Sequence, residues 1–107
     1  MSPLVSVIVP IYNAAPFLRE TLDSIIASTY RPIEIVMVDD GSKVDGLSIA
    51  QKYCANHAEC TVIAQANQGV SVARNNAIHH AKGMYILPVD ADDKIADTFI
   101  QKAVEAI

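Results

Sequence analysis

Four short, largely apolar runs divide this chain, and each is followed by a segment with helical spacing. The runs are predicted to be strands, and they occupy residues 4–10, 33–38, 61–64 and 84–89. The helical segments begin near Pro16 and then cover about 45–57, 70–81 and 96–107. Strands that alternate with helices form a mostly parallel sheet with helices on both faces. The predicted fold class is therefore α/β, with a three-layer, Rossmann-like architecture.

Local signals refine the predicted helix ends and buried faces. Asn13 is a favoured residue for capping the first helix, because its side chain can accept a hydrogen bond from a free amide of the first turn. Gly83 occupies the position after the C-cap of the 70–81 helix, where glycine is favoured. The buried stripes of the first and last helices are expected to contain Phe17, Leu18, Leu22, Ile25 and Ile26, and Phe99, Ile100, Ala103, Val104 and Ile107.

Charge, cysteine spacing and hydropathy exclude several classes of protein. The chain has 12 acidic residues against 8 Lys and Arg, a net charge of −4, so no nucleic-acid partner is expected. Cys54 and Cys60 lack Cys-x-x-Cys spacing and are expected to be reduced, buried thiols, which fits the cytoplasm. No apolar run reaches the roughly 18 residues that span a bilayer. The expected location is cytoplasmic, with attachment to the inner face of the membrane left open for a longer parent protein.

Carboxylates gather after two of the predicted strands. Asp39 and Asp40 follow the second strand, and Asp90, Asp92 and Asp93 follow the fourth. The carboxyl ends of parallel strands lie at one edge of a sheet, where α/β proteins bind ligands. Like charges repel each other there unless a cation offsets them, and Mg2+ and Mn2+ prefer oxygen ligands. Two groups of aspartates at one edge favour a metal site, and turn or capping aspartates are the alternative.

Two further side chains at this edge each have two possible roles. Arg74 lies on the third predicted helix and can either bind phosphate oxygens through a forked pair of hydrogen bonds or be a solvated surface residue. Tyr12 follows the first strand and can either stack on a flat base or cover the edge of the sheet. Composition and spacing leave both pairs of alternatives open.

The strands and the polar loops after them form a set of motifs: VSVIVPIYN at 5–13, VDDGS at 38–42, NQGVSVARN at 67–75, AKGMYI at 81–86 and DADD at 90–93. This set resembles family two glycosyltransferases. Each motif alone is moderately specific, but together they span nearly the whole chain in the order and spacing of that family. The resemblance implies the N-terminal, nucleotide-sugar-binding part of a GT-A fold.

The resemblance also implies a nucleotide-sugar donor, often a UDP-sugar. By that analogy, the base and ribose are held by Pro10, Tyr12, Asn13 and Asp40. Asp40 reaches the uracil edge, and Asp39 lies beside it. These roles come from the family and were not indicated by composition or spacing.

The metal site follows from the same resemblance. Asp92 is expected to bind Mn2+ or Mg2+, with Asp90 near the ribose or a metal-bound water and Asp93 close behind. Arg74 is expected near the diphosphate. The cation would neutralise the diphosphate and stabilise it as a leaving group. Family members of this kind invert the anomeric carbon, so a general base must deprotonate the acceptor hydroxyl.

The chain departs from the family in length. Family members run well past two hundred residues, and the half after the Asp-x-Asp motif carries the acceptor site and the base. Residues 1–107 are therefore expected to be a truncated GT-A domain that binds the donor and is inactive alone. The missing half would bind an acceptor saccharide or lipid-linked saccharide, in cell-envelope polysaccharide or glycoconjugate synthesis. Apolar surface left uncovered on the final strands and helix is expected to allow self-association.

Two interpretations from other classes compete with this one. A receiver-type signalling domain has a similar fold and an acidic metal pocket, but its acidic pair would follow the first strand, whereas here the aspartates follow the second and fourth. A non-catalytic interaction module could keep the same fold. A Rossmann dehydrogenase or a P-loop protein would need a glycine-rich phosphate loop, which is absent after the first strand.

Overall fold

The computed structural model describes residues 2–42 and 46–107 and contains alternating strands and helices. Their bounds are β1 (Val5–Ile11), α1 (Ala15–Ile26), β2 (Ile33–Asp40), α2 (Gly46–Asn56), β3 (Cys60–Gln65), α3 (Val70–His80), β4 (Tyr85–Pro88) and α4 (Phe99–Glu105). The predicted start of the second helix at Asp45 lies outside the described residues. All strand pairs are parallel, in the order β3-β2-β1-β4. The predicted α/β fold with a parallel sheet is confirmed.

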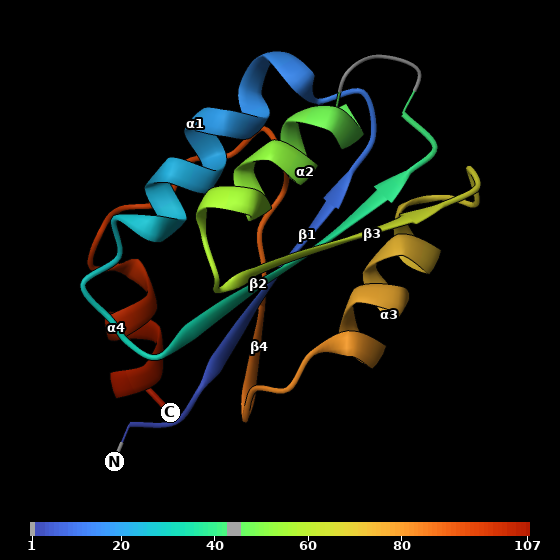
Figure 1. Ribbon diagram of the computed structural model, residues 1–107. Helices are drawn as coiled ribbons and strands as arrows, with labels where there is room; N and C mark the ends of the chain where they lie inside the picture. Colours follow the sequence, from blue (N-terminus) through green and yellow to red (C-terminus); the bar gives the residue numbers. More distant parts are fainter. Residues whose placement is uncertain (1, 43–45) are drawn as a thin grey trace.

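Helices cover both faces of the sheet (Figure 1). α1, α2 and α4 lie on one face and α3 lies on the other. Successive side chains of a strand point to opposite faces, so Val7 and Ile35 join the core under α1 and α2, while Ile8 and Val36 join the core under α3. Every residue of the central strand β1 is buried. Burial on both faces explains why β1 is an unbroken apolar run, not an alternating one.

The second core, under α3, is the thinner of the two. α3 presents Ala73 and Ala77 to the sheet, and both are fully buried against Ile8, Val36 and Val38. Small side chains let the helix backbone approach the strands closely. The start of α3 is thereby held next to the ends of β1 and β2.

Two predicted details of the first helix are wrong. The residue before α1 is Ala14, whose carbonyl accepts hydrogen bonds from the amides of Phe17 and Leu18, each at 3.0 Å. Asn13 stands one residue too early to cap the helix; it has a left-handed backbone, with φ 52°, and turns the chain out of β1. Phe17 is 52% exposed because Leu18 and Leu22 form the buried side of the helix.

The last helix is shorter than predicted. Residues 96–98 precede it, and α4 begins at Phe99. Ile100 is fully buried and Val104 packs against the same core, because these two residues share one side of the helix. Phe99 and Ile107, which were expected on the buried side, are 44% and 75% exposed.

A network of polar contacts at the amino ends of β1 and β2 fastens the connection between α3 and β4. The amide of Gly83 donates to Ser6 Oγ at 2.7 Å, and Ser6 Oγ donates to Glu34 Oε2. The amide of Lys82 donates to the same Glu34 oxygen at 2.6 Å. The prediction that Gly83 follows the C-cap of α3 is wrong, because the helix ends at Ala81, which has an extended backbone. Gly83 is needed for space: a Cβ there would lie 2.5 Å from Ser6 Oγ and 2.7 Å from the Ser6 backbone nitrogen.

The two cysteines are both free, and the buried one is Cys60. Burial raises the pKa of the Cys60 thiol to about 12. Within residues 2–42 and 46–107, no helix has the length and apolar character needed to cross a bilayer.

Replacing Gly83 tests the close packing at this end of the sheet. Gly83→Ala is expected to lower the free energy of unfolding by about 1–3 kcal/mol, because the added methyl group must displace backbone atoms of β1. Urea denaturation of the wild type and the variant measures the change. Lys82→Ala is the control, since the exposed Lys82 contributes its backbone amide to the network and the change should stay within about 0.5 kcal/mol. Equal stability of Gly83→Ala and the wild type would contradict the steric argument.

Candidate functional site

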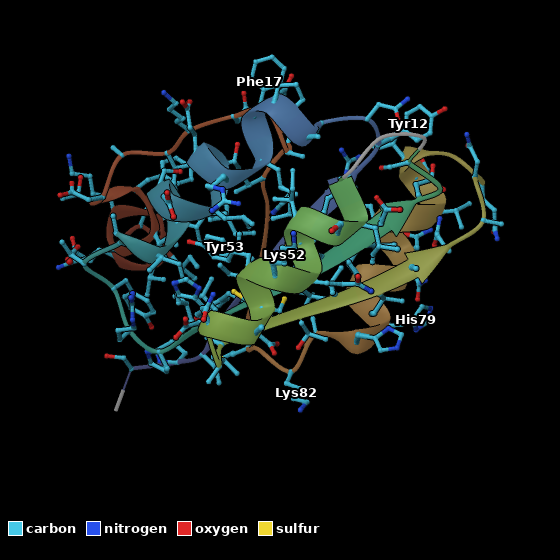
Figure 2. All side chains as sticks on the ribbon, turned by 45° about the horizontal axis from the view of Figure 1, so that its top comes forward. Tyr12, Phe17, Lys52, Tyr53, His79 and Lys82 are labelled. Carbon is cyan, nitrogen blue, oxygen red and sulfur yellow. The ribbon has the colours of Figure 1, made fainter. Side chains whose placement is uncertain are left out.

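Parallel pairing brings the loops after all four strands to one edge of the sheet. Chain order also reverses at β1: the chain passes from β1 to β2 on one side of it and crosses from β3 to β4 on the other. Ligands of open α/β sheets bind outside the carboxyl ends of strands near such a point. In Figure 2, Tyr12 and Phe17 lie at this edge, and Lys82 lies at the opposite edge.

Asp40 connects the end of β2 to the loop before α3. Its Oδ1 accepts hydrogen bonds from the Gln65 side-chain amide at 2.9 Å and the Gln68 backbone N–H at 2.8 Å. Its Oδ2 accepts from the Gly69 backbone N–H at 3.0 Å. These donors, led by Gln65, favour the charged carboxylate and hold the pKa of Asp40 below its ordinary value of 3.8. Asp40 is thus a buried anion whose partners order the start of α3.

Gly69 gives this loop its direction into the helix. It has φ +104°, a backbone conformation that side-chain-bearing residues rarely adopt. The N–H groups of Gln68 and Gly69 both donate to the Asp40 carboxylate, and the turn at Gly69 then directs the chain into α3.

Asp39 lies beside Asp40 but faces different partners. Its Oδ1 accepts a hydrogen bond from Ser42 Oγ, and its Oδ2 accepts from the Ser42 backbone N–H at 3.1 Å. Ser42 Oγ also accepts from the backbone N–H of Asn13 at 3.2 Å. Asp39 therefore shapes the loop after β2 and connects it to the loop after β1, and its predicted nucleotide contact stays a prediction.

A cavity of about 200 Å³ opens between the end of β1 and the start of α3. It is lined by Pro10, Ile11, Tyr12, Asp40, Asn67, Gly69, Val70 and Ala73. Most of this wall is apolar, with one carboxylate and one amide. Such a composition suits a flat heterocycle that stacks on one side and forms hydrogen bonds at its rim.

A second hollow, of about 250 Å³, continues from the first toward the loop after β4. It shares Pro10, Tyr12 and Val70 with the first cavity. Its other lining residues are Asn13, Ala14, Phe17, Asp90, Ala91 and Asp92. The two hollows therefore adjoin each other, and together their walls extend from Asp40 to the acidic turn.

Three carboxylates meet at that turn. Asp90, Asp92 and Asp93 each offer an oxygen, these atoms lie within 4.8 Å of one another, and all three residues are exposed. A hydrogen bond from the Asp93 amide to the Asp90 carbonyl, at 3.0 Å, closes the turn. Oxygen ligands at this spacing fit Mg2+ or Mn2+, which also keep water or phosphate oxygens as ligands.

Arg74 reaches the acidic turn from α3. Its Nη2 lies 3.6 Å from Asp90 Oδ1, and both side chains are partly exposed, so this ion pair is weak. The Nε of Arg74 is buried and has no hydrogen-bond partner among the described residues. The Nη2 side of the guanidinium, which faces Asp90, could bind an anionic oxygen at the turn, and this fits the predicted place of Arg74 near a diphosphate.

The structure therefore brings Pro10, Tyr12, Asn13, Asp40, Arg74, Asp90, Asp92 and Asp93 to one edge and buries Asp39 behind the loops. Sequence reasoning assigned no site role to four lining residues of the segment after β3: Asn67, Gly69, Val70 and Ala73. A usable signal was present, since these residues follow the third strand and open a helix at the same edge.

The comparisons with known proteins agree with this geometry. The family model described as Glycosyl transferase family 2 matches residues 6–107. The chain belongs to glycosyltransferase family 2. It is 45% identical over 105 residues to the uncharacterized glycosyltransferase EpsJ of Bacillus subtilis, covering 98% of this chain and 30% of EpsJ. It is also 37% identical over 91 residues to chondroitin synthase of Escherichia coli, covering 85% of this chain and 13% of that protein.

Two solved structures share the fold of this chain. S. aureus TarS in complex with UDP-GlcNAc has a TM-score of 0.87 and 34% identity, over 94% of this chain and 30% of that chain. The mannosyltransferase PcManGT from Pyrobaculum calidifontis, in complex with GDP-Man and Mn2+, has a TM-score of 0.91 and 32% identity, over 98% of this chain and 32% of that chain. The fold of this family 2 domain is of the GT-A type, as predicted. The chain spans about a third of the length of these two solved chains, the first of which is TarS 1-349.

The low pKa of Asp40 makes a testable contribution to pH-dependent stability. A carboxyl with a lower pKa in the folded state stabilises the fold above the pKa of the unfolded state, about 3.9, and this contribution is lost as pH falls through the folded-state pKa. Asp40→Asn is expected to be less stable at pH 7 and to lose less stability below pH 4. Urea denaturation from pH 7 to pH 3 measures both effects.

The control for this experiment is Asp97→Asn, since Asp97 is exposed and uses its backbone carbonyl, not its carboxylate, to bind Thr29. It should follow the pH profile of the wild type. A profile of Asp40→Asn parallel to that of the wild type would contradict the role assigned to Asp40.

Proposed function

We propose that this family 2 domain binds the nucleotide part of a nucleotide-sugar donor, a UDP-sugar, together with Mn2+ or Mg2+. The observation that carries the proposal is the pair of adjoining hollows that extends from Asp40 to the acidic turn. A nucleoside diphosphate has the matching layout, with a flat base at one end and, at the other, a diphosphate that needs a cation. TarS with UDP and with UDP-GlcNAc, and PcManGT with GDP-Man and Mn2+, support this ligand class.

In this proposal the base occupies the first cavity, and the ribose lies in the adjoining second hollow. Tyr12, 44% exposed at its mouth, offers an aromatic face for stacking, and Pro10 forms the wall beside it. Asp40 lies at the inner rim and can accept a hydrogen bond from the base, in addition to those that order the loop before α3. Asn13 lines the second hollow, where the ribose would lie, and Asp39 keeps Asn13 and Ser42 in place.

The diphosphate and metal occupy the acidic turn. Asp92 and Asp93 would hold the cation, with Asp90 next to it or to one of its waters, and Arg74, whose Nη2 faces Asp90, would bind a diphosphate oxygen. A cation held there would offset the negative charge that develops on the diphosphate when the sugar leaves. Without ligand, the repulsion among the three carboxylates remains, so nucleotide and metal are expected to bind together.

The whole protein is proposed to be an inverting transferase that moves the sugar to a hydroxyl group. The acceptor is a saccharide or lipid-linked saccharide, bound by residues outside 1–107, in cell-envelope polysaccharide or glycoconjugate synthesis. Residues 1–107 would then be the donor-binding part of a larger GT-A domain, which fits a chain that spans 30% of EpsJ. The proposed place of action is the cytoplasm at the inner face of the membrane, which suits two free cysteines.

Self-association of this chain stays a prediction. Met84, Ile86 and Phe99 are exposed apolar residues on or beside β4 and α4, the region where uncovered apolar surface was expected.

Removing Asp92 tests the proposed function directly. Asp92→Ala is expected to reduce UDP affinity in the presence of Mn2+ to the level measured with EDTA, because the cation loses a ligand. Isothermal titration with UDP, and with GDP in parallel, measures this. The matched control is Asp97→Ala, an exposed aspartate outside the cluster, which should bind like the wild type. Equal losses in both variants, or Mn2+-independent binding by the wild type, would contradict the proposal.

The 107-residue chain is also expected to bind donor without transferring sugar. Among the described carboxylates of this edge, Asp39 accepts two hydrogen bonds and Asp40 three, and the acidic turn is assigned to the metal. None is left to deprotonate an acceptor hydroxyl. Incubation with UDP-GlcNAc, Mn2+ and saccharide acceptors, followed by mass spectrometry, should detect no product. Transfer at the rate of a full-length relative assayed alongside would disprove the assignment.

A further inference from the structure

Two hydroxyl groups of α1 hold the acidic turn. Thr21 Oγ1 donates a hydrogen bond to the carbonyl of Ala91 at 2.8 Å, and Thr21 is 1% exposed. Ser24 Oγ accepts a hydrogen bond from the backbone N–H of Ile95 at 3.2 Å. Thr21 and Ser24 are three residues apart and so lie on the same side of the helix. In Figure 1 the segment between β4 and α4 passes alongside α1, where these contacts form.

The Thr21 hydroxyl also has a possible hydrogen-bond acceptor within its own helix. Its oxygen also lies 3.2 Å from the carbonyl of Phe17, the usual intrahelical acceptor for a threonine. A hydroxyl has one proton to donate, and the shorter contact is to Ala91. Ser24 donates its proton to the Thr21 carbonyl at 2.7 Å, which leaves its oxygen free to accept from Ile95. The Thr21 hydroxyl thus donates to the loop, and the Ser24 oxygen accepts from it.

The position of these contacts gives them their importance. Ala91 stands between Asp90 and Asp92, so a bond to its carbonyl fixes the backbone between two proposed ligands of the cation. The three carboxylates repel each other. Among the described residues, their ion-pair partner is Arg74, which lies 3.6 Å from Asp90. Hydrogen bonds to the backbone do not depend on those charges, and they hold the turn before any cation arrives.

We propose that Thr21, assisted by Ser24, is a positioning residue that sets the spacing of Asp90 and Asp92 for the metal. The inference rests on the proposed function of the acidic turn. It assigns a role in metal affinity to α1, a helix that supplies no ligand. Groups that orient metal ligands in this indirect way typically change metal affinity by tenfold or more when removed.

The third contact between α1 and the loop serves as a control. Lys94 Nζ lies 3.0 Å from Glu20 Oε2, and both side chains are about two-thirds exposed. Exposed ion pairs of this kind stabilise little. Glu20→Gln removes this pair without touching either hydroxyl, so it separates any general weakening of the contact between helix and loop from loss of the Thr21 bond.

The experiment measures Mn2+ affinity in the presence of saturating UDP, and UDP affinity in the presence of EDTA. Thr21→Val keeps the shape of the side chain but removes the donor, and is expected to weaken Mn2+ binding about tenfold while leaving metal-free UDP binding unchanged. Thr21→Ser, which restores the hydroxyl, and Glu20→Gln should bind Mn2+ like the wild type. If Thr21→Val does not fold, Ser24→Ala tests the same contact through Ile95, with several-fold weaker Mn2+ binding expected.

The outcomes separate this inference from the proposed function. If the wild type binds no Mn2+ with UDP, the proposed metal site is wrong, and the inference fails with it. If the wild type binds Mn2+ and Thr21→Val binds it equally well, the inference alone is wrong. Equal weakening in Thr21→Val and Thr21→Ser, or loss of metal-free UDP binding in Thr21→Val, would show a general structural role and would likewise overturn it.

Discussion

The hydrogen bonds of the Asp40 carboxylate are the contact on which the rest of the edge depends. They join the last residue of β2 to the chain 25 to 29 residues later, where the loop after β3 becomes α3. The start of α3 is fixed by these bonds and by Ala73 packed against the sheet. Val70 and Gly69 then form one wall of the cavity opposite Tyr12, and Arg74, one turn further on, reaches Asp90. One buried charge therefore sets both the shape of the first cavity and the place of Arg74 beside the acidic turn.

Much of the fold follows from local patterns in the sequence. The unbroken apolar run of β1 predicts burial on both faces, and the aspartates after β2 and β4 predict an acidic edge, because parallel strands end together. Neither inference needs a contact between distant residues. The wrong predictions depend on such contacts: Asn13 was expected to cap α1 but bonds to Ser42, and Gly83 was expected at a helix end but gives space to Ser6.

Local sequence patterns likewise predict one part of the candidate site and not the other. Residue type and spacing indicate the carboxylates, since a cation site needs several of them close together. They do not indicate that the amides of Gln68 and Gly69 donate hydrogen bonds to Asp40. Nor do they indicate that the Thr21 hydroxyl donates to Ala91, outside its own helix. Donor and acceptor pairings across 28 or 70 residues are decided by tertiary packing, and no local pattern encodes them. The resemblance to family two glycosyltransferases supplies some of these site roles, because members of one family share the same tertiary packing.

The two ends of the proposed ligand path are built on opposite faces of the sheet. The cavity wall comes from α3 on one face, and the support of the acidic turn comes from Thr21 and Ser24 of α1 on the other. β1 is the central strand between them, and its end supplies Pro10 and Tyr12 to both hollows. A ligand that fills the path contacts both layers at once, so its binding energy opposes any opening of the layers at this edge. In the proposed complex, binding of base and metal would be coupled without a moving part, because β1 lines the first cavity and pairs with β4, which leads into the acidic turn.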